Sequence, residues 1–356
     1  MRHTLSLFIG GWLLALVACA GLIGASNVDG GCFRDIQHRG SLGSYLRYET
    51  LTQQLNLGIH SLHLTLHHGR EACLHPGKPI PGDWYVYQMC MVNDETNVML
   101  LSQALTEVAT WSHHPTRRGV HKPVVLWLEF QDFNMFQPHE VDGLLWHAFG
   151  PRLFTPAHFM ARHPHASTMH DVLHHALKTN ASCGAWPTLS EMRGRVLAVV
   201  EYGQAIDYAC TDQVANARAA FVGAHAFRLG QRPASFVIWT IQDGTSAKQV
   251  HAGRYLRDAQ FMVRHVFHDI TDTDLHHSLE QGANFIDSWY SLDSEQERSM
   301  SNPTTTHWRP SPTDSHILAG ALLQPVTHVP PEDTRFDMLI CCLCALGFVF
   351  MVCNRW

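Results

Sequence analysis

Apolar and polar residues alternate along several short stretches of this chain, in the pattern of buried or half-buried strands. In residues 58–66, the leucines at every second position would point to one side of a strand, and His63 and Thr65 to the other. Similar runs lie at 122–130, 194–202, 234–242 and 282–290. The pattern therefore predicts strands over these five ranges.

Segments with apolar residues at helical spacing lie between these runs. They cover residues 97–114, 168–179 and 255–267. Before the third run, Thr188 and Glu191 have the spacing of a capping box, so we expect a short helix there that ends at Gly194. Strands that alternate with helices predict a parallel sheet with helical crossovers, and so an α/β fold.

Both ends of the chain have the composition of targeting segments. Residues 1–25 combine a basic start, an apolar stretch and small residues, as in a secretory signal peptide. We expect one domain over 30–293, followed by a Pro/Ser/Thr-rich stalk over 294–335. Within the domain, Asn180 begins the one usable glycosylation sequon. Residues 336–353 contain an uncharged run that predicts a transmembrane segment, with a cleaved lipid-anchor signal and a buried core helix as alternatives. The protein is thus expected at the cell surface or outside the cell, tethered to the membrane.

An oxidising compartment makes disulfides the expected state of the cysteines in the domain. Proximity in the sequence favours the pairs Cys73–Cys90 and Cys183–Cys210, and it leaves Cys32 without a partner.

Composition and charge narrow the classes of function. A formal net charge of −6 offers no basic surface for nucleic acid. Histidine is frequent, with 27 residues spread along the chain, so the molecule gains positive charge as the pH falls through about 6.5. The densest group is His63, His67, His68 and His75, for which a zinc or copper site is one interpretation.

Several segments, taken in order, resemble the blocks of a known family. They are "LTQQLNLGIHSLHLTL", "PVVLWLEFQDF", "RLFTPAHF", "WPTLSEMRGRVLAVVE", "VIWTIQDG" and "LEQGANFIDSWY". They resemble the phosphatidylinositol-specific phospholipase C-like phosphodiesterases, most closely the secreted calcium-dependent type, over residues 38–292. The resemblance implies a TIM-type (β/α) barrel with its site at the carboxyl ends of the strands. It also implies a phosphoric diester hydrolase that acts on membrane phosphatidylinositol with calcium.

The resemblance leaves two registers open at the start of the barrel. In the family, an early Thr-His-Asn-Ser-Tyr motif supplies a catalytic histidine and a calcium ligand. The segment SLGSY at 41–45 matches the end of this motif, which places Leu42 at the histidine and Gly43 at the asparagine. A shifted register uses His38 instead, with Arg39 beside it.

The second motif of the family has lost its acids in this chain. There, a strand reading Leu-Glu-Leu-Asp-Val supplies two carboxylates, whereas this chain has His63 and Thr65. Neutral nitrogen and hydroxyl groups are poor ligands for a hard cation such as calcium. In the last strand, Trp289 stands where the family has an aspartate, and Asp287 is displaced by two positions.

Other positions keep residues that are capable of catalysis. His75 stands where the second catalytic histidine of the family belongs, Glu129 and Asp132 lie near the end of one strand, and Asp243 follows another. The candidate catalytic residues are therefore His75, His38, Glu129, Asp132 and Asp243, and the candidate ligand-binding residues are His63, Thr65, Arg39, Arg70 and Trp289.

Three functions fit these residues. The first is a catalytically impaired phosphodiesterase-fold protein that binds a phosphoinositide-like or other ligand, from membrane lipid or an inositol phosphate, at the barrel mouth. The second is an active, calcium-independent diester hydrolase in which His75 works with another histidine and Arg39 or Arg70 replaces the metal. The third is a histidine-based zinc or copper protein.

Overall fold

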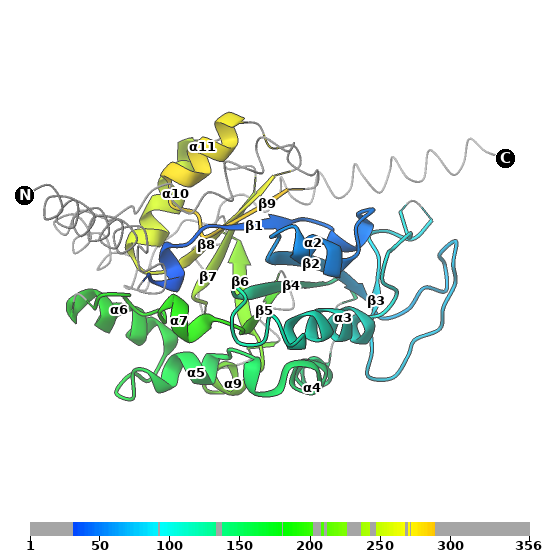
Figure 1. Ribbon diagram of the computed structural model, residues 1–356, viewed down its shortest axis with the longest axis horizontal. Coiled ribbons are helices and arrows are strands. Elements are labelled where there is room, and N and C mark those ends of the chain that lie inside the picture. Colours follow the sequence, from blue (N-terminus) through cyan, green and yellow to red (C-terminus); the bar gives the residue numbers. More distant parts are fainter. Residues whose placement is uncertain are drawn as a thin grey trace, which may run out of the picture.

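Eight parallel strands close into a barrel at the centre of the molecule (Figure 1). The structure, a computed structural model, describes residues 31–288 except 92, 133–136, 180, 202–207, 210–211, 226–235, 243–246, 268–269 and 271. The barrel strands are β1 (His38–Ser41), β2 (Ser61–His67), β4 (Val124–Phe130), β5 (Val196–Glu201), β6 (Phe221–His225), β7 (Ile238–Gln242), β8 (Met262–Phe267) and β9 (Phe285–Ser288).

Hydrogen bonds between the first strand and two others close the barrel. β1 pairs in parallel with β9 on one side and with β2 on the other, where Gly40 lies opposite Ser61. The remaining strands follow in the order β9-β8-β7-β6-β5-β4-β2, and the short β3 (Tyr85–Val86) adds to β2 in antiparallel fashion. The expectation of a TIM-type α/β barrel is confirmed.

Helices in the connections cover the barrel. Figure 1 shows α3, α4, α5, α7 and α9 on one side of the strands, and α10 and α11 on the other. The helices are α2 (Leu51–Asn56), α3 (Leu101–His113), α4 (Pro138–Phe149), α5 (Pro156–Ala161), α6 (Met169–Thr179), α7 (Leu189–Met192), α9 (Asp212–Ala217), α10 (Ala247–Asp258) and α11 (Asp272–Glu280), with 3₁₀ turns η2 (Phe33–Asp35), η3 (Ser44–Leu46) and η5 (Gly150–Arg152).

Most elements lie where the hydrophobic pattern predicts them. The five predicted strands correspond to β2, β4, β5, β7 and β9, and two of the predicted helices correspond to α3 and α6. The capping box at Thr188 is present at the start of α7, and Gly194 follows that helix with a φ of 66°.

The predicted helix over 255–267 is wrong. Its first residues end α10, and its last six form strand β8, which is buried along its whole length. Between them Gln260 has a φ of 73°, which interrupts the helix. Arg264 gave the segment a helix-like spacing of apolar residues, but its side chain points into the barrel, where two carboxylates hold it.

One of the two predicted disulfides is confirmed and the other is wrong. Cys73 pairs with Cys90, whereas Cys183 pairs with Cys32, 151 residues away. β1 and β5 are not neighbours in the barrel, but the segments that precede them meet, and Cys32 forms a β-bridge with Thr188 there. Proximity in the sequence therefore misled the prediction; Cys210 lies outside the described residues. Both disulfides are consistent with secretion.

Some predictions concern residues that the structure does not describe. They are the signal peptide, the stalk, the anchor segment 336–353 and Asn180. Among the helices of the described residues, none has both the length and the apolar character to cross a bilayer.

Candidate functional site

Polar side chains meet inside the barrel, towards the carboxyl ends of its strands. His63 on β2 and Glu129 on β4 form one group, and Glu201 on β5, Arg264 on β8 and Asp287 on β9 form a second. All five side chains are largely or completely buried. Buried ionisable groups persist only when they are paired, so their partners decide what chemistry they can perform.

Both ring nitrogens of His63 are engaged by the protein itself. Its Nε2 lies 3.1 Å from Oε2 of Glu129, and the backbone N–H of Gly43 donates to its Nδ1 at 3.3 Å. A nitrogen that accepts a hydrogen bond from an amide carries no proton, so the proton is on Nε2, where it is donated to Glu129. His63 thus has no free lone pair with which to take a proton from a substrate.

Glu129 is also engaged by protein donors. Besides the bond from His63, it accepts from Thr65 Oγ1 at 3.3 Å and from Gln131 Nε2 at 2.7 Å. Burial opposes its ionisation, but the hydrogen bonds of His63 and Thr65 and the positive charge of Arg264 hold its pKa below the usual value.

These groups do not fit a calcium ion, which takes six to eight oxygen ligands. On β2 and β4 this chain offers the carboxylate of Glu129, which is already bound to protein donors, the hydroxyl of Thr65 and the imidazole of His63. No step through calcium follows from this arrangement.

Arg264 lies between two carboxylates at the centre of the barrel. Its Nε donates to Asp287 Oδ2 at 2.6 Å, and its Nη1 donates to Glu201. The guanidinium also lies 4.2 Å from the ring centroid of Trp127, and Thr240 donates to Glu201 at 2.5 Å. Burial raises the pKa of Asp287, while the charge and hydrogen bond of Arg264 oppose that rise. One cation thus lies between two acids, while Arg264 Nη2 and Asp287 Oδ1 are buried without a hydrogen-bond partner among the described residues.

His38 lies at the opposite end of the barrel from these groups. It is the first residue of β1, opposite Phe285 of β9, and its ring packs between Phe33 and Phe285. Burial, with smaller contributions from the charges of His60 and Lys122, lowers the pKa of His38 to about 3. Arg39 follows it on β1. The structure does not bring His38 together with His63.

Arg70 and His75, in the connection between β2 and β3, lie around Asp94, which follows β3. Arg70 Nη2 donates to the Asp94 carbonyl at 2.7 Å and to its carboxylate at 3.1 Å. The backbone N–H of His75 donates to the same carboxylate at 3.0 Å, and the His75 side chain is exposed. These contacts hold the loop in shape and do not join the groups around Glu129.

His67, at the end of β2, is the histidine near the mouth whose ring keeps an unused nitrogen. Its ring stacks on Tyr87 with centroids 3.8 Å apart, and its buried Nε2 has no hydrogen-bond partner. Burial lowers the pKa of His67, partly offset by the charge of Asp132. Asp132 accepts a hydrogen bond from the backbone N–H of His68, the residue after His67, at 2.5 Å.

The remaining predicted residues divide into two groups. Asp243 and Trp289 lie outside the described residues. The four histidines of the hypothetical metal site are described but not brought together, and in the described part of the chain no three His, Cys, Asp or Glu side chains are placed to hold a metal ion.

Sequence reasoning missed Arg264 and Glu201. Each is a charged residue in or at the end of an otherwise apolar run, "FMVRHVF" and "VLAVVE", and that was the available signal.

Comparison with known proteins finds solved structures with a similar fold. No family model matches the chain, and no curated protein sequence does. A calcium-dependent phosphoinositol-specific phospholipase C from a Pseudomonas species superposes with a TM-score of 0.58 at 17% identity, covering 74% of this chain and 92% of that one. A calcium-dependent phosphatidylinositol-specific phospholipase C from Streptomyces antibioticus gives a TM-score of 0.55 at 15% identity, covering 73% and 95%.

The chain has the fold of these phospholipases C. At this level of identity the likeness describes the backbone, so the side chains at the mouth have to be judged on their own contacts.

Proposed function

We propose that this protein is a catalytically impaired member of the phospholipase C fold that binds a phosphoinositide-like ligand at its barrel mouth. The observation that carries the proposal is the state of His63, whose two nitrogens are occupied by Glu129 and Gly43. A general base has to be within hydrogen-bond reach of the proton that it abstracts and must have a free lone pair.

Arg47 is the residue best placed to meet the phosphate of such a ligand. It follows the 3₁₀ turn after β1, and its Nη2 donates to the carbonyl of Ser288, the last residue of β9, at 2.6 Å. Its buried Nε has no hydrogen-bond partner, and no carboxylate among the described residues forms an ion pair with it. An arginine with unused donors at the mouth is suited to an anionic headgroup.

Hydrolysis tests the catalytic part of the proposal. We expect the purified chain to release no product from phosphatidylinositol or a glycosyl-phosphatidylinositol, either with calcium or with a chelator, at a level above that of a sample without protein. Turnover that depends on the folded wild-type chain would contradict the proposal.

Binding to vesicles tests the ligand. The chain should bind phosphatidylinositol-containing vesicles more tightly than pure phosphatidylcholine vesicles, and Arg47→Gln should weaken this by about tenfold, the loss typical of one charge-assisted hydrogen bond. The matched control is Arg118→Gln, an exposed arginine before β4 at the amino end of the barrel. An equal loss of vesicle binding in both variants would show that the overall charge of the protein, and not Arg47, determines the binding.

His67 supports a second candidate, an active and calcium-independent diester hydrolase. Its free Nε2 lies at the carboxyl end of β2, and its lowered pKa keeps it unprotonated at neutral pH, as a base requires. If turnover is found, this candidate expects its loss in His67→Ala.

Secretion with a membrane tether at residues 336–353 belongs to the same proposal. The composition of the two ends of the chain and the two disulfides support it.

A further inference from the structure

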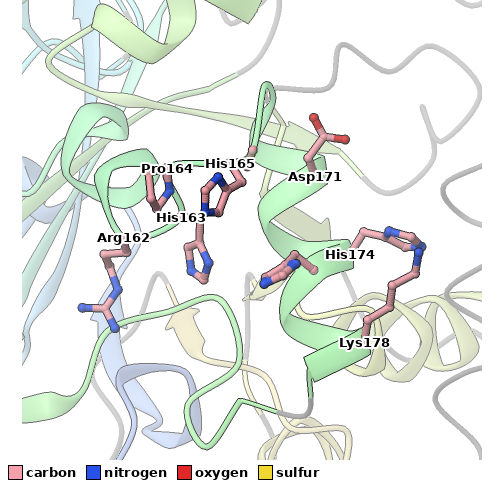
Figure 2. A pocket seen from close by; sticks show the side chains of 9 residues that line it. Arg162, His163, Pro164, His165, Asp171, His174 and Lys178 are labelled. Carbon is pink, nitrogen blue, oxygen red and sulfur yellow. The ribbon is translucent and has the colours of Figure 1, made fainter.

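A second candidate binding site lies outside the barrel, far from the mouth. A pocket of about 480 Å³ opens between residues 162–166 and helix α6 (Figure 2). His170 on α6 bonds to the carbonyl of Phe236, which precedes β7, and the chain after α6 leads into β5. The pocket therefore belongs to the amino-terminal end of the barrel, whereas Arg47 and His63 belong to the carboxyl-terminal end.

Nitrogen-bearing side chains dominate the walls of this pocket. One wall carries Arg162, His163 and His165, and the other carries His174, His175 and Lys178. Figure 2 shows His163 and His165 on the segment beside α6, and His174 and Lys178 projecting from the helix one turn apart. Every one of these groups can donate a hydrogen bond, and each is cationic when protonated.

The acids near the pocket are already engaged. Asp171 is the one carboxylate in its lining, and it accepts the backbone N–H groups of Ser167 and Thr168 at 3.2 and 2.8 Å, at the start of α6. Figure 2 shows its carboxylate turned away from His163. Glu191 of α7 forms an ion pair with Arg162. Lys178 and the histidines are the other ionisable groups that line the pocket. Figure 2 shows His174 and Lys178 on the side of α6 that carries Asp171.

The histidines of the two walls approach each other closely. The rings of His163 and His175 lie edge to face with centroids 6.2 Å apart, and His163 is hydrogen-bonded to the backbone of Ala185. Protonation places like charges on facing rings, and a bound anion would relieve that repulsion. A metal ion is the weaker alternative, because no three of the described His, Cys, Asp or Glu side chains are placed to hold one.

We propose that this pocket binds a tetrahedral oxyanion, a phosphate or sulfate group, held by Lys178 and by protonated histidines from both walls, and that it binds more tightly as the pH falls from about 7.5 to about 5.5. Near neutral pH the charges of Arg162 and Lys178 are largely balanced by Glu191 and Asp171, so the histidines supply the net charge. Burial and the charges of Arg162 and His175 lower the pKa of His163, and its hydrogen bond to the backbone of Ala185 opposes this.

Sulfate is the appropriate first probe, since its charge stays constant over this pH range while that of phosphate changes. Calorimetric titration of the purified full chain should show sulfate binding about tenfold tighter at about pH 5.5 than at about pH 7.5. At the lower pH, His174→Gln and Lys178→Gln should each weaken binding by about threefold to tenfold. Both side chains lie at the surface of α6, and unchanged thermal unfolding of the variants would show that they are folded.

One control locates the effect. His276→Gln removes an exposed histidine on α11, away from the pocket, and should bind sulfate like the wild-type chain. Equal affinity at the two pH values, or equal affinity in the α6 variants and the wild-type chain, would overturn the proposal.

Vesicles then distinguish the source of the anion. Phosphatidylcholine vesicles with phosphatidic acid, compared with phosphatidylcholine alone, present the phosphate on a surface. If the α6 variants lose binding to free sulfate but not to these vesicles, the pocket takes a soluble oxyanion. If they lose both, it also accepts a lipid headgroup.

Discussion

Arg264 is the residue on which the interior of the barrel depends most. It is buried, it donates to Glu201 and Asp287, and its guanidinium lies over Trp127. Removing it leaves two carboxylates in a medium that solvates them poorly. We expect Arg264→Met to lower the free energy of unfolding by about 3–5 kcal/mol, measured by urea denaturation.

A triple variant separates the charge from the packing. Glu201→Gln, Asp287→Asn and Arg264→Met together leave no uncompensated charge, so the loss should be clearly smaller than in Arg264→Met alone. If the free energy of unfolding falls by the same amount in both variants, the role of Arg264 is to fill space over Trp127 rather than to neutralise the two acids.

At the scale of elements, β1 depends on a glycine. A Cβ at Gly40 would lie 1.6 Å from Asp287 Oδ1 and 2.7 Å from the Cβ of Ser61, so β1 could not stay in register between β9 and β2. Gly40→Ala should therefore cost about 3 kcal/mol of stability, seen as a lowered midpoint of thermal unfolding. Gly143→Ala in α4 is the control: its Cβ would meet nothing within 4 Å, and it should stabilise the helix by about 0.5–1 kcal/mol.

The same strand shows what the sequence could predict of the fold. Long apolar runs such as β2, β4 and β5 were recognisable because they are buried and regular. β1 and β6 were missed, because they are only four and five residues long and each contains a glycine. β8 was predicted as a helix, because the sequence does not reveal that its arginine would be neutralised from other strands.

Within the candidate site, the sequence predicted which residues lie on which strand, but it did not predict which residues contact each other. His63 and Glu129 were found as positions on two recognisable strands, but their pairing depends on β2 lying beside β4. The partners of Arg264 are 23 and 63 residues away, on β9 and β5, and only the pairing of the strands into the barrel brings them together. For the same reason, the disulfide of Cys183 was assigned to the wrong partner.

At the scale of the whole molecule, buried histidines make the fold sensitive to acid. His38 and His265 have pKa values lowered to about 3 and about 4, chiefly by burial. The unfolded chain binds a proton at each below about pH 6.5, whereas the folded chain stays unprotonated to much lower pH, so stability falls as the pH falls. Each histidine should lower the free energy of unfolding by about 2 kcal/mol between pH 7 and pH 5.

Urea denaturation at several pH values measures this loss. In His38→Leu, which keeps an apolar group between Phe33 and Phe285, the dependence of stability on pH should weaken by about 1 kcal/mol per pH unit between pH 6 and pH 5. An unchanged dependence would mean that His38 is protonated in the folded protein or already neutral in the unfolded one.

The Cys32–Cys183 disulfide gives the molecule a covalent topology that its barrel alone would not have. It joins the chain just before the first strand to the chain just before β5, so residues 32–183 form a closed ring that holds α3, β4 and the 162–166 segment. An exposed stretch of that ring is 113–120, which includes Arg118. A protease that cuts there opens the ring but releases no fragment. Until the disulfide is reduced, the two halves of the barrel remain one molecule and can refold without having to find each other in solution.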